Sequence, residues 1–148
     1  MRVNLPFFDT SYLVRLYLDD RGYEAVREFA GKGMAVATAW HARAEVVAAL
    51  HRSFRERRMK QREFRAVLEQ FKNDSERDLF EWIPLTDSVR RRLEAVFFKA
   101  SATVFLRGAD ALHLACAVEN GFTEVFSNDR HFLAAAPLFG LKPINLIE

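Results

Sequence analysis

The sequence has a single cysteine, Cys116, so the chain cannot form an internal disulfide bond. One unpaired thiol is typical of a reducing compartment, and we expect a cytoplasmic location in which Cys116 is a small buried hydrophobic residue. No signal peptide is recognisable, and no apolar run is long enough to cross a membrane. Internal repeats, low-complexity segments and linkers are also absent, so residues 1–148 are predicted to form one domain.

The composition favours a large hydrophobic core. Half of the 148 residues are hydrophobic and 14 of them are phenylalanine, which excludes disorder of the whole chain. The net charge of +2 is small, but the charges are segregated. Basic residues crowd the segment 52–65, whereas several acidic residues stand alone in apolar surroundings. This distribution is compatible with a nucleic-acid partner but does not establish one.

Short apolar segments alternate with helical segments along the chain. Strands are predicted at residues 2–8, 34–37, 79–85, 124–126 and 142–146. Helices are predicted at residues 11–18, 23–30, 39–54, 87–101, 111–120 and 130–135. A further helix is predicted to follow a basic turn after residue 54 and to end at about residue 71, and residues 73–76 are predicted to form a loop. Strands that alternate with helices indicate βαβ units, so the predicted fold class is α/β with a parallel sheet.

Several residues predict where these elements begin and end. Thr38 and Thr86 are expected to cap the helices that follow them, because a threonine hydroxyl accepts a hydrogen bond from a free helical N–H group. Gly121 is expected to end the helix before it. Pro6 has no N–H to donate, so we expect a bulge or a late start to strand pairing near it.

Four acidic residues occupy comparable positions: Asp9, Glu45, Asp110 and Asp129. Asp9 and Asp129 each follow a predicted strand, Asp110 opens a helix, and Glu45 lies on the helix after the second strand. The carboxyl ends of parallel strands and the amino ends of helices meet at one edge of a sheet, so these side chains are expected to share a pocket. Clustered carboxylates raise one another's pKa unless a cation compensates them. Mg²⁺ or Mn²⁺ with oxygen ligands would provide that compensation.

The sequence resembles the PIN-domain ribonucleases, especially the toxins of VapBC-type toxin–antitoxin pairs. The resemblance rests on segments that come in the family's order: residues 8–13 (FDTSYL), 44–46 (AEV), 109–115 (ADALHLA) and 127–132 (SNDRHF). It implies a three-layer fold, with a central parallel sheet flanked by helices. It also implies that Asp9, Glu45, Asp110 and Asp129 hold the catalytic Mg²⁺ or Mn²⁺, and that Ser11 and Ser127 are supporting hydroxyls.

The function that this resemblance implies is hydrolysis of RNA phosphodiester bonds by a metal-activated water. Toxins of this kind form homodimers and are silenced by a small antitoxin protein, which we expect here as well. Two alternatives stay open at this point. The chain could be a PIN nuclease of RNA processing or decay that has no antitoxin, or a catalytically inactive RNA-binding module.

The histidines and the basic segment have competing interpretations. His41 and Glu45 share a helix face and could bind a metal, but a third soft ligand is missing, so a histidine at the pocket rim is favoured. His113 is predicted to be a buried structural donor, and His131 is predicted to lie at the surface. The basic segment contains candidate ligands for RNA phosphates: Arg52, Arg55, Arg57 and Arg58. A solvated helical hairpin explains the same segment equally well.

Overall fold

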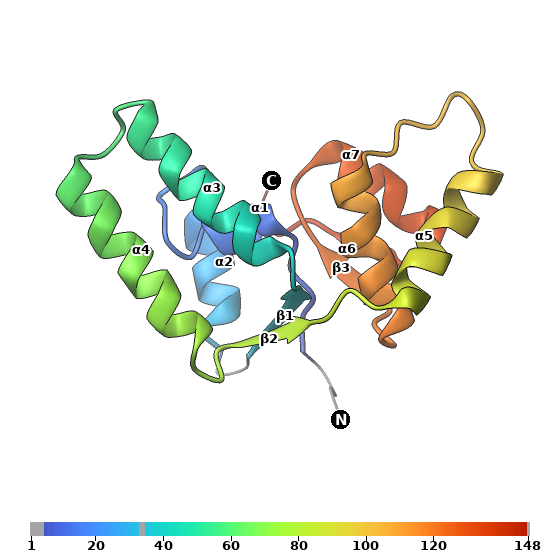
Figure 1. The fold of residues 1–148 in the computed structure, drawn as a ribbon, viewed down its shortest axis with the longest axis horizontal. Helices are drawn as coiled ribbons and strands as arrows, with labels where there is room; N and C mark the ends of the chain where they lie inside the picture. Colours follow the sequence, from blue (N-terminus) through green and yellow to red (C-terminus); the bar gives the residue numbers. More distant parts are fainter. Residues whose placement is uncertain (1–4, 33–34, 148) are drawn as a thin grey trace.

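A parallel sheet separates two layers of helices in the computed structural model, which describes residues 5–32 and 35–147 (Figure 1). The helices are α1 (Thr10–Val14), α2 (Tyr23–Ala30), α3 (Ala42–Arg55), α4 (Gln61–Ser75), α5 (Asp87–Lys99), α6 (Gly108–Glu119), α7 (Arg130–Ala135) and the 3-10 helix η1 (Ala136–Phe139). The strands are β1 (Val36–Ala39), β2 (Phe80–Ile83), β3 (Glu124–Phe126) and β4 (Lys142–Ile144). The predicted α/β class with a central parallel sheet between helical layers is confirmed.

Residues 6–9 join two parallel strand pairs into one arrangement. β1 pairs with β2, and β3 pairs with β4. Between these pairs, Phe7 forms a parallel bridge to Ala37 and Phe8 forms one to Phe126. The order across the sheet is therefore β2, β1, residues 6–9, β3 and β4. Asp9, which follows Phe8 directly, consequently lies near the middle of the carboxyl edge.

Pro6 takes part in this pairing through its carbonyl group, which needs no proline N–H. The Pro6 oxygen accepts a hydrogen bond of 2.9 Å from the Ala37 N–H, and the Phe8 N–H donates to the Ala37 oxygen at 2.9 Å. The predicted strand at residues 2–8 is thus reduced to bridges at Phe7 and Phe8. Its residues 2–4 lie outside the described part of the chain.

Side-chain alternation at the sheet centre divides the core between the two layers. Phe7 is fully buried in the core that contains Leu114 of α6 and Phe132 of α7. Phe8 is fully buried in the core that contains Tyr12 of α1 and Val46 of α3. Successive strand residues face opposite sides of a sheet, so α1–α4 cover one face and α5–α7 cover the other, as Figure 1 shows.

Two local predictions are wrong, and tertiary contacts explain both. The predicted loop at 73–76 is helical as far as Ser75, and Tyr17 Oη, from the turn after α1, supports it by donating to Asp74 Oδ2 at 2.8 Å. Thr38 does not cap a helix. It lies in β1, where its hydroxyl donates to the Phe8 oxygen at 2.9 Å, and α3 begins only at Ala42.

Other boundaries moved by a few residues. Thr86 caps α5 as predicted, and Gly121 follows the last turn of α6 with a φ of +83°. The strand predicted at 79–85 covers only Phe80–Ile83, and the helix predicted at 111–120 begins earlier, at Gly108. The second strand is Val36–Ala39 rather than 34–37, and Met34 lies outside the described residues. Within residues 5–32 and 35–147, no helix is both long and apolar enough to cross a membrane.

Candidate active site

A pocket of about 250 Å³ opens at the carboxyl edge of the sheet, where residues 6–9 and β3 end. Its lining residues are Asp9, Thr10, Ser11, Glu45, Arg107, Ala109, Asp110, His113 and Asp129. The structure therefore brings together all four acidic residues that the sequence singled out. They come from the sheet edge and from both helical layers.

Asp9 lies at the centre of the pocket and is the most buried of the four acids. It caps α1, and its Oδ1 accepts hydrogen bonds from the Tyr12 N–H at 3.1 Å and from Ser11 Oγ at 2.7 Å. Its Oδ2 accepts from Ser127 Oγ at 2.5 Å. Burial raises the pKa of Asp9 despite these donors. The carboxylate is thus well oriented but poorly solvated, a combination that favours a nearby cation.

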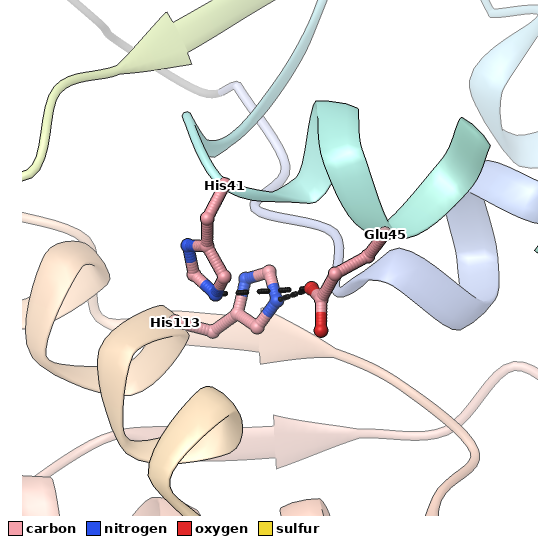
Figure 2. A group of neighbouring side chains, drawn as sticks. All are labelled: His41, Glu45 and His113. Atoms are coloured by element: carbon pink, nitrogen blue, oxygen red, sulfur yellow. Dashed lines mark hydrogen bonds and ion pairs between the residues drawn. The ribbon is translucent and has the colours of Figure 1, made fainter. Parts of the chain in front are cut away.

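Glu45, in the first turn of α3, is held by two donors on a single oxygen (Figure 2). Its Oε1 lies 2.6 Å from Thr10 Oγ1 and 2.7 Å from His113 Nε2. Burial acts to raise the pKa of Glu45, but the hydrogen bond and the charge of His113, together with Thr10, outweigh it and lower the pKa to about 2. Glu45 is therefore a fixed, ionised carboxylate at neutral pH.

His41 completes the group around Glu45. Its Nε2 lies 3.7 Å from Glu45 Oε1 and 3.3 Å from the Ala109 oxygen, and its ring centroid is 4.0 Å from that of His113. Burial and the neighbouring His113 lower the pKa of His41 to about 4, so this ring is neutral at pH 7. We call Thr10, His41, Glu45 and His113 the histidine side of the pocket.

Arg107 joins the other two acids. Its Nη2 lies 2.6 Å from Asp110 Oδ2 and 2.6 Å from Asp129 Oδ2. Asp110 lies in the first turn of α6, and burial raises its pKa although Arg107 opposes this. Burial also acts on Asp129, but the hydrogen bonds from Arg107, Phe132 N–H and His131 N–H outweigh it and lower the pKa. We call Arg107, Asp110 and Asp129 the arginine side.

Ser127 connects the arginine side to the central acid. It is fully buried, donates to Asp9 Oδ2, and accepts a hydrogen bond of 2.9 Å from the Asp129 N–H. A single hydroxyl thus sets the relative position of Asp9 and Asp129. Ser11 supports Asp9 from the other side and also reaches Asn128 Oδ1 at 3.3 Å.

The chemistry of this set fits a hard divalent cation. The pocket offers carboxylate oxygens as its ionised ligand groups, the type that Mg²⁺ and Mn²⁺ prefer. Burial raises the pKa of both Asp9 and Asp110, so a nearby cation would relieve the cost of keeping them charged. The residues that could hold such an ion are Asp9, Glu45, Asp110 and Asp129.

Comparison with known proteins identifies the family. The family model described as "PIN domain" matches residues 7–137. The chain belongs to the PIN-domain family. The match covers the residues that line the pocket of this PIN domain, while extension of one domain over all of residues 1–148 stays a prediction.

Solved structures agree on the fold of this PIN domain. A chain in the crystal structure of VapBC2 from Rickettsia felis bound to a DNA fragment from their promoter superposes with a TM-score of 0.65 at 14% sequence identity. The likeness covers 95% of this chain and 98% of that one. No curated protein matches the sequence.

Sequence reasoning missed two contributors to the PIN-domain pocket. Arg107 lies three residues before Asp110, a spacing that brings side chains together on a helix, and this was the available signal. Thr10 was not among the predicted site residues, yet its hydroxyl donates to Glu45, while Asp9 caps α1. His113 is buried and hydrogen-bonded, as predicted, and His131 is half-buried against Phe105 rather than fully at the surface.

The arginines of the basic segment do not line this pocket. They lie at the exposed carboxyl end of α3 and in the turn after it: Arg52, Arg55, Arg57 and Arg58. Arg52 pairs with Glu56 at 3.0 Å, and Arg58 lies 3.6 Å from Asp20. Arg52 is seven residues beyond Glu45, about 10 Å further along the helix. Any contact of this segment with RNA would therefore be made outside the pocket.

Proposed function

We propose that this PIN domain is a metal-dependent endoribonuclease that hydrolyses RNA phosphodiester bonds and acts as the toxin of a toxin–antitoxin pair. The observation that carries the proposal is the convergence of four carboxylates, one from each matching sequence segment, on one pocket of a PIN-family chain. The fold-level likeness to a chain of the VapBC2 complex supports the toxin part of the proposal.

In this mechanism Asp9, Glu45, Asp110 and Asp129 hold Mg²⁺ or Mn²⁺. When bound, the ion supplies a more acidic water and positive charge beside the phosphate. Water attacks the phosphorus and the 3′ oxygen leaves, so the products carry a 5′-phosphate and a 3′-hydroxyl. No histidine pair or nucleophilic serine is needed for this reaction.

The remaining pocket residues orient the carboxylates. Ser11 and Ser127 donate to the two oxygens of Asp9, which leaves the carboxylate little freedom to rotate. Thr10 and His113 fix Glu45 in the same way. Such partners of metal ligands matter because loss of one commonly lowers metal affinity or activity by about 10- to 100-fold.

Partners follow from the charges of the molecule. Arg52, Arg55, Arg57 and Arg58 are proposed to contact RNA phosphates at some distance from the cleaved bond, which would make binding weaken with salt. The acidic pocket suits an arginine from a small antitoxin, because the planar guanidinium can bridge carboxylates. Arg107 already makes that kind of bridge within the chain. A homodimer is proposed on the family resemblance.

Cleavage of RNA by the purified chain tests the enzymatic part. With Mg²⁺ or Mn²⁺ we expect fragments with 5′-phosphate ends, and we expect EDTA to stop the reaction. Asp9→Asn should be inactive, and Asp87→Asn, which changes an exposed acid on α5, should keep full activity. Cleavage that is equally fast in Asp9→Asn would overturn the proposed mechanism.

Expression in the native host tests the toxin part. The chain expressed alone should slow growth, the Asp9→Asn variant should not, and co-expression of a short neighbouring gene should restore growth. An active nuclease that is harmless in its own host and binds no neighbour's product would instead be an RNA-processing enzyme.

A further inference from the structure

The fold supplies the third ligand that the pair His41 and Glu45 lacks in sequence. His113, 68 residues beyond Glu45, reaches across from α6 so that its ring lies between α6 and the start of α3 (Figure 2). One ligand atom from each of the three residues lies within 4.8 Å of the others. His113 Nε2 is 2.7 Å from Glu45 Oε1, and His41 Nε2 is 3.7 Å from the same oxygen.

We propose that His41, Glu45 and His113 form a second metal site, selective for a transition-metal ion of the Zn²⁺ class, which shares Glu45 with the Mg²⁺ site. The two sites differ in ligand chemistry. Two imidazole nitrogens and one carboxylate suit Zn²⁺ and related ions, whereas Asp9, Asp110 and Asp129 offer oxygen alone and suit Mg²⁺. The histidine side is therefore the part of the pocket that discriminates between ions.

Both distances from Glu45 to the histidines are within about 1 Å of those that such an ion requires. Ligand atoms at about 2.0–2.1 Å from a tetrahedral zinc ion lie about 3.3 Å from one another. The distance from Glu45 Oε1 to His113 Nε2 has to increase slightly, and that to His41 Nε2 has to decrease slightly. The His41 side chain is 16% exposed and the Glu45 side chain 34%, so the ion has access from the rim, and His113 closes the inner wall at 3%. Three protein ligands leave one position open to water.

The surroundings of the histidines indicate a reversible site rather than a permanent one. In most metal sites the second ring nitrogen of each histidine donates to a carboxylate or carbonyl, which strengthens binding. Here Nδ1 of His41 and Nδ1 of His113 are buried without a hydrogen-bond partner in the part of the chain that the structure describes. We therefore expect an affinity below that of structural zinc sites, so the ion can load and unload.

Because the two proposed sites share Glu45, Zn²⁺ and Mg²⁺ should compete for the pocket. An ion held by the histidines occupies Glu45 Oε1, which is then not available to the oxygen-ligand site. Zn²⁺ should consequently reduce the effect of Mg²⁺ on the same molecule. Inhibition of cleavage by Zn²⁺ rests on the proposed nuclease function, whereas binding of Zn²⁺ does not.

Titration of the metal-free, tag-free chain with Co²⁺ tests the binding. Co²⁺ is a visible probe for such a site, and Zn²⁺ competition then gives the zinc affinity. We expect one Co²⁺ per chain with visible absorption bands, displaced by Zn²⁺ but not by an equal concentration of Mg²⁺. His41→Ala should weaken Zn²⁺ binding by at least about tenfold and leave the Mg²⁺-dependent rise in unfolding temperature unchanged.

Two further variants make the result decisive. His51→Ala removes an exposed histidine of the same helix and should bind Zn²⁺ as the wild type does. His113→Gln, compared at equal folded fraction by thermal unfolding, should weaken Zn²⁺ binding as His41→Ala does. Equal Zn²⁺ affinity in the wild type, His41→Ala and His113→Gln would overturn the site. None of these measurements uses RNA, so failure of the site and failure of the nuclease proposal are distinguishable.

Discussion

The two sides of the pocket stabilise the negative charge of their carboxylates in different ways. On the histidine side, Glu45 is held by a hydroxyl and an imidazole that come from opposite helical layers. On the arginine side, Asp110 and Asp129 share one guanidinium on a side chain that is 40% exposed. Packing between the layers fixes the first arrangement. The second can be replaced by another cation, because the exposed Arg107 side chain can turn into solvent. Asp9 lies between them and accepts hydrogen bonds from two hydroxyls and a backbone N–H.

This comparison indicates how the metal-free protein tolerates its acidic pocket. Like charges raise one another's pKa, and Arg107 supplies the positive charge that Asp110 and Asp129 need in the absence of an ion. Mg²⁺ bound by Asp110 and Asp129 would therefore compete with Arg107 for these carboxylates. The predictions below separate the two sides, from the largest expected effect to the smallest.

Loss of an acid from either side should abolish RNA cleavage. Asp110→Asn and Glu45→Gln each remove one carboxylate ligand, and each should lower the rate by more than about 100-fold. Loss of a residue that only hydrogen-bonds to a metal ligand already lowers activity by about 10- to 100-fold. Asp87→Asn on the exposed surface of α5 is the matched control. Initial rates on a labelled RNA measure the effect. Full activity of Asp110→Asn would show that the arginine side is not needed for cleavage, and full activity of Glu45→Gln would show the same for the histidine side.

Addition of Mg²⁺ should stabilise the folded chain. An ion at about 100 times its Kd adds about 2.7 kcal/mol to the free energy of unfolding. For a chain of 148 residues this corresponds to a rise in Tm of roughly 5–10 °C. Thermal unfolding with and without the ion measures the shift. An unchanged Tm at saturating Mg²⁺ and Mn²⁺ would argue strongly against a metal site.

Removal of the hydroxyl on the histidine side should lower stability by about 1 kcal/mol. Thr10→Ala deletes the 2.6 Å hydrogen bond to Glu45 and leaves Oε1 with one donor fewer. Thr10→Ser keeps the hydroxyl and is the control. Urea unfolding of the metal-free chain gives the difference in free energy. Equal stability of Thr10→Ala and Thr10→Ser would mean that this hydrogen bond does not hold Glu45.

Removal of the Arg107 guanidinium should slightly destabilise the metal-free chain but favour the Mg²⁺-bound chain. Arg107→Gln should lower the stability of the metal-free chain by less than about 1 kcal/mol, because the pairs are partly exposed. The same variant should bind Mg²⁺ more tightly than the wild type, since no guanidinium then competes with the ion for Asp110 and Asp129. Arg91→Gln breaks an exposed pair with Asp87 on α5 and should not change Mg²⁺ affinity. Weaker Mg²⁺ binding in Arg107→Gln would contradict this competition.

The positions of Asp9 and Asp129 are accessible to sequence reasoning because both follow strands of a parallel sheet. That rule places side chains at an edge without any knowledge of loop paths. The bridge made by Arg107 is different, because its contact with Asp129 spans 22 residues and depends on how α6 and β3 pack. Sequence reasoning did not find the third ligand beside His41 and Glu45 for the same reason, since His113 approaches them from the opposite helical layer.

Local patterns failed where tertiary contacts override propensity. The segment at residues 73–75 is polar and suggests a loop, yet the bond from Tyr17 to Asp74 extends α4 through it. Thr38 resembles a helix cap in sequence, but its hydroxyl is used inside the sheet by the Phe8 carbonyl. Alternation of strands and helices sufficed for the α/β class, because that pattern depends only on the order of elements.

The distribution of the pocket residues over three layers has a consequence for local unfolding. Glu45 belongs to the layer of α1–α4, Asp110 belongs to the layer of α5–α7, and Asp9 and Asp129 belong to the sheet edge between them. In the metal-free chain, the layers can open to hydrogen exchange as separate cooperative units. An ion held by all four acids would tie these units together. Amide protons of α3 and α6 would then exchange through one common opening, so occupation of the pocket would be visible along the whole of both helices, including turns far from the bound ion.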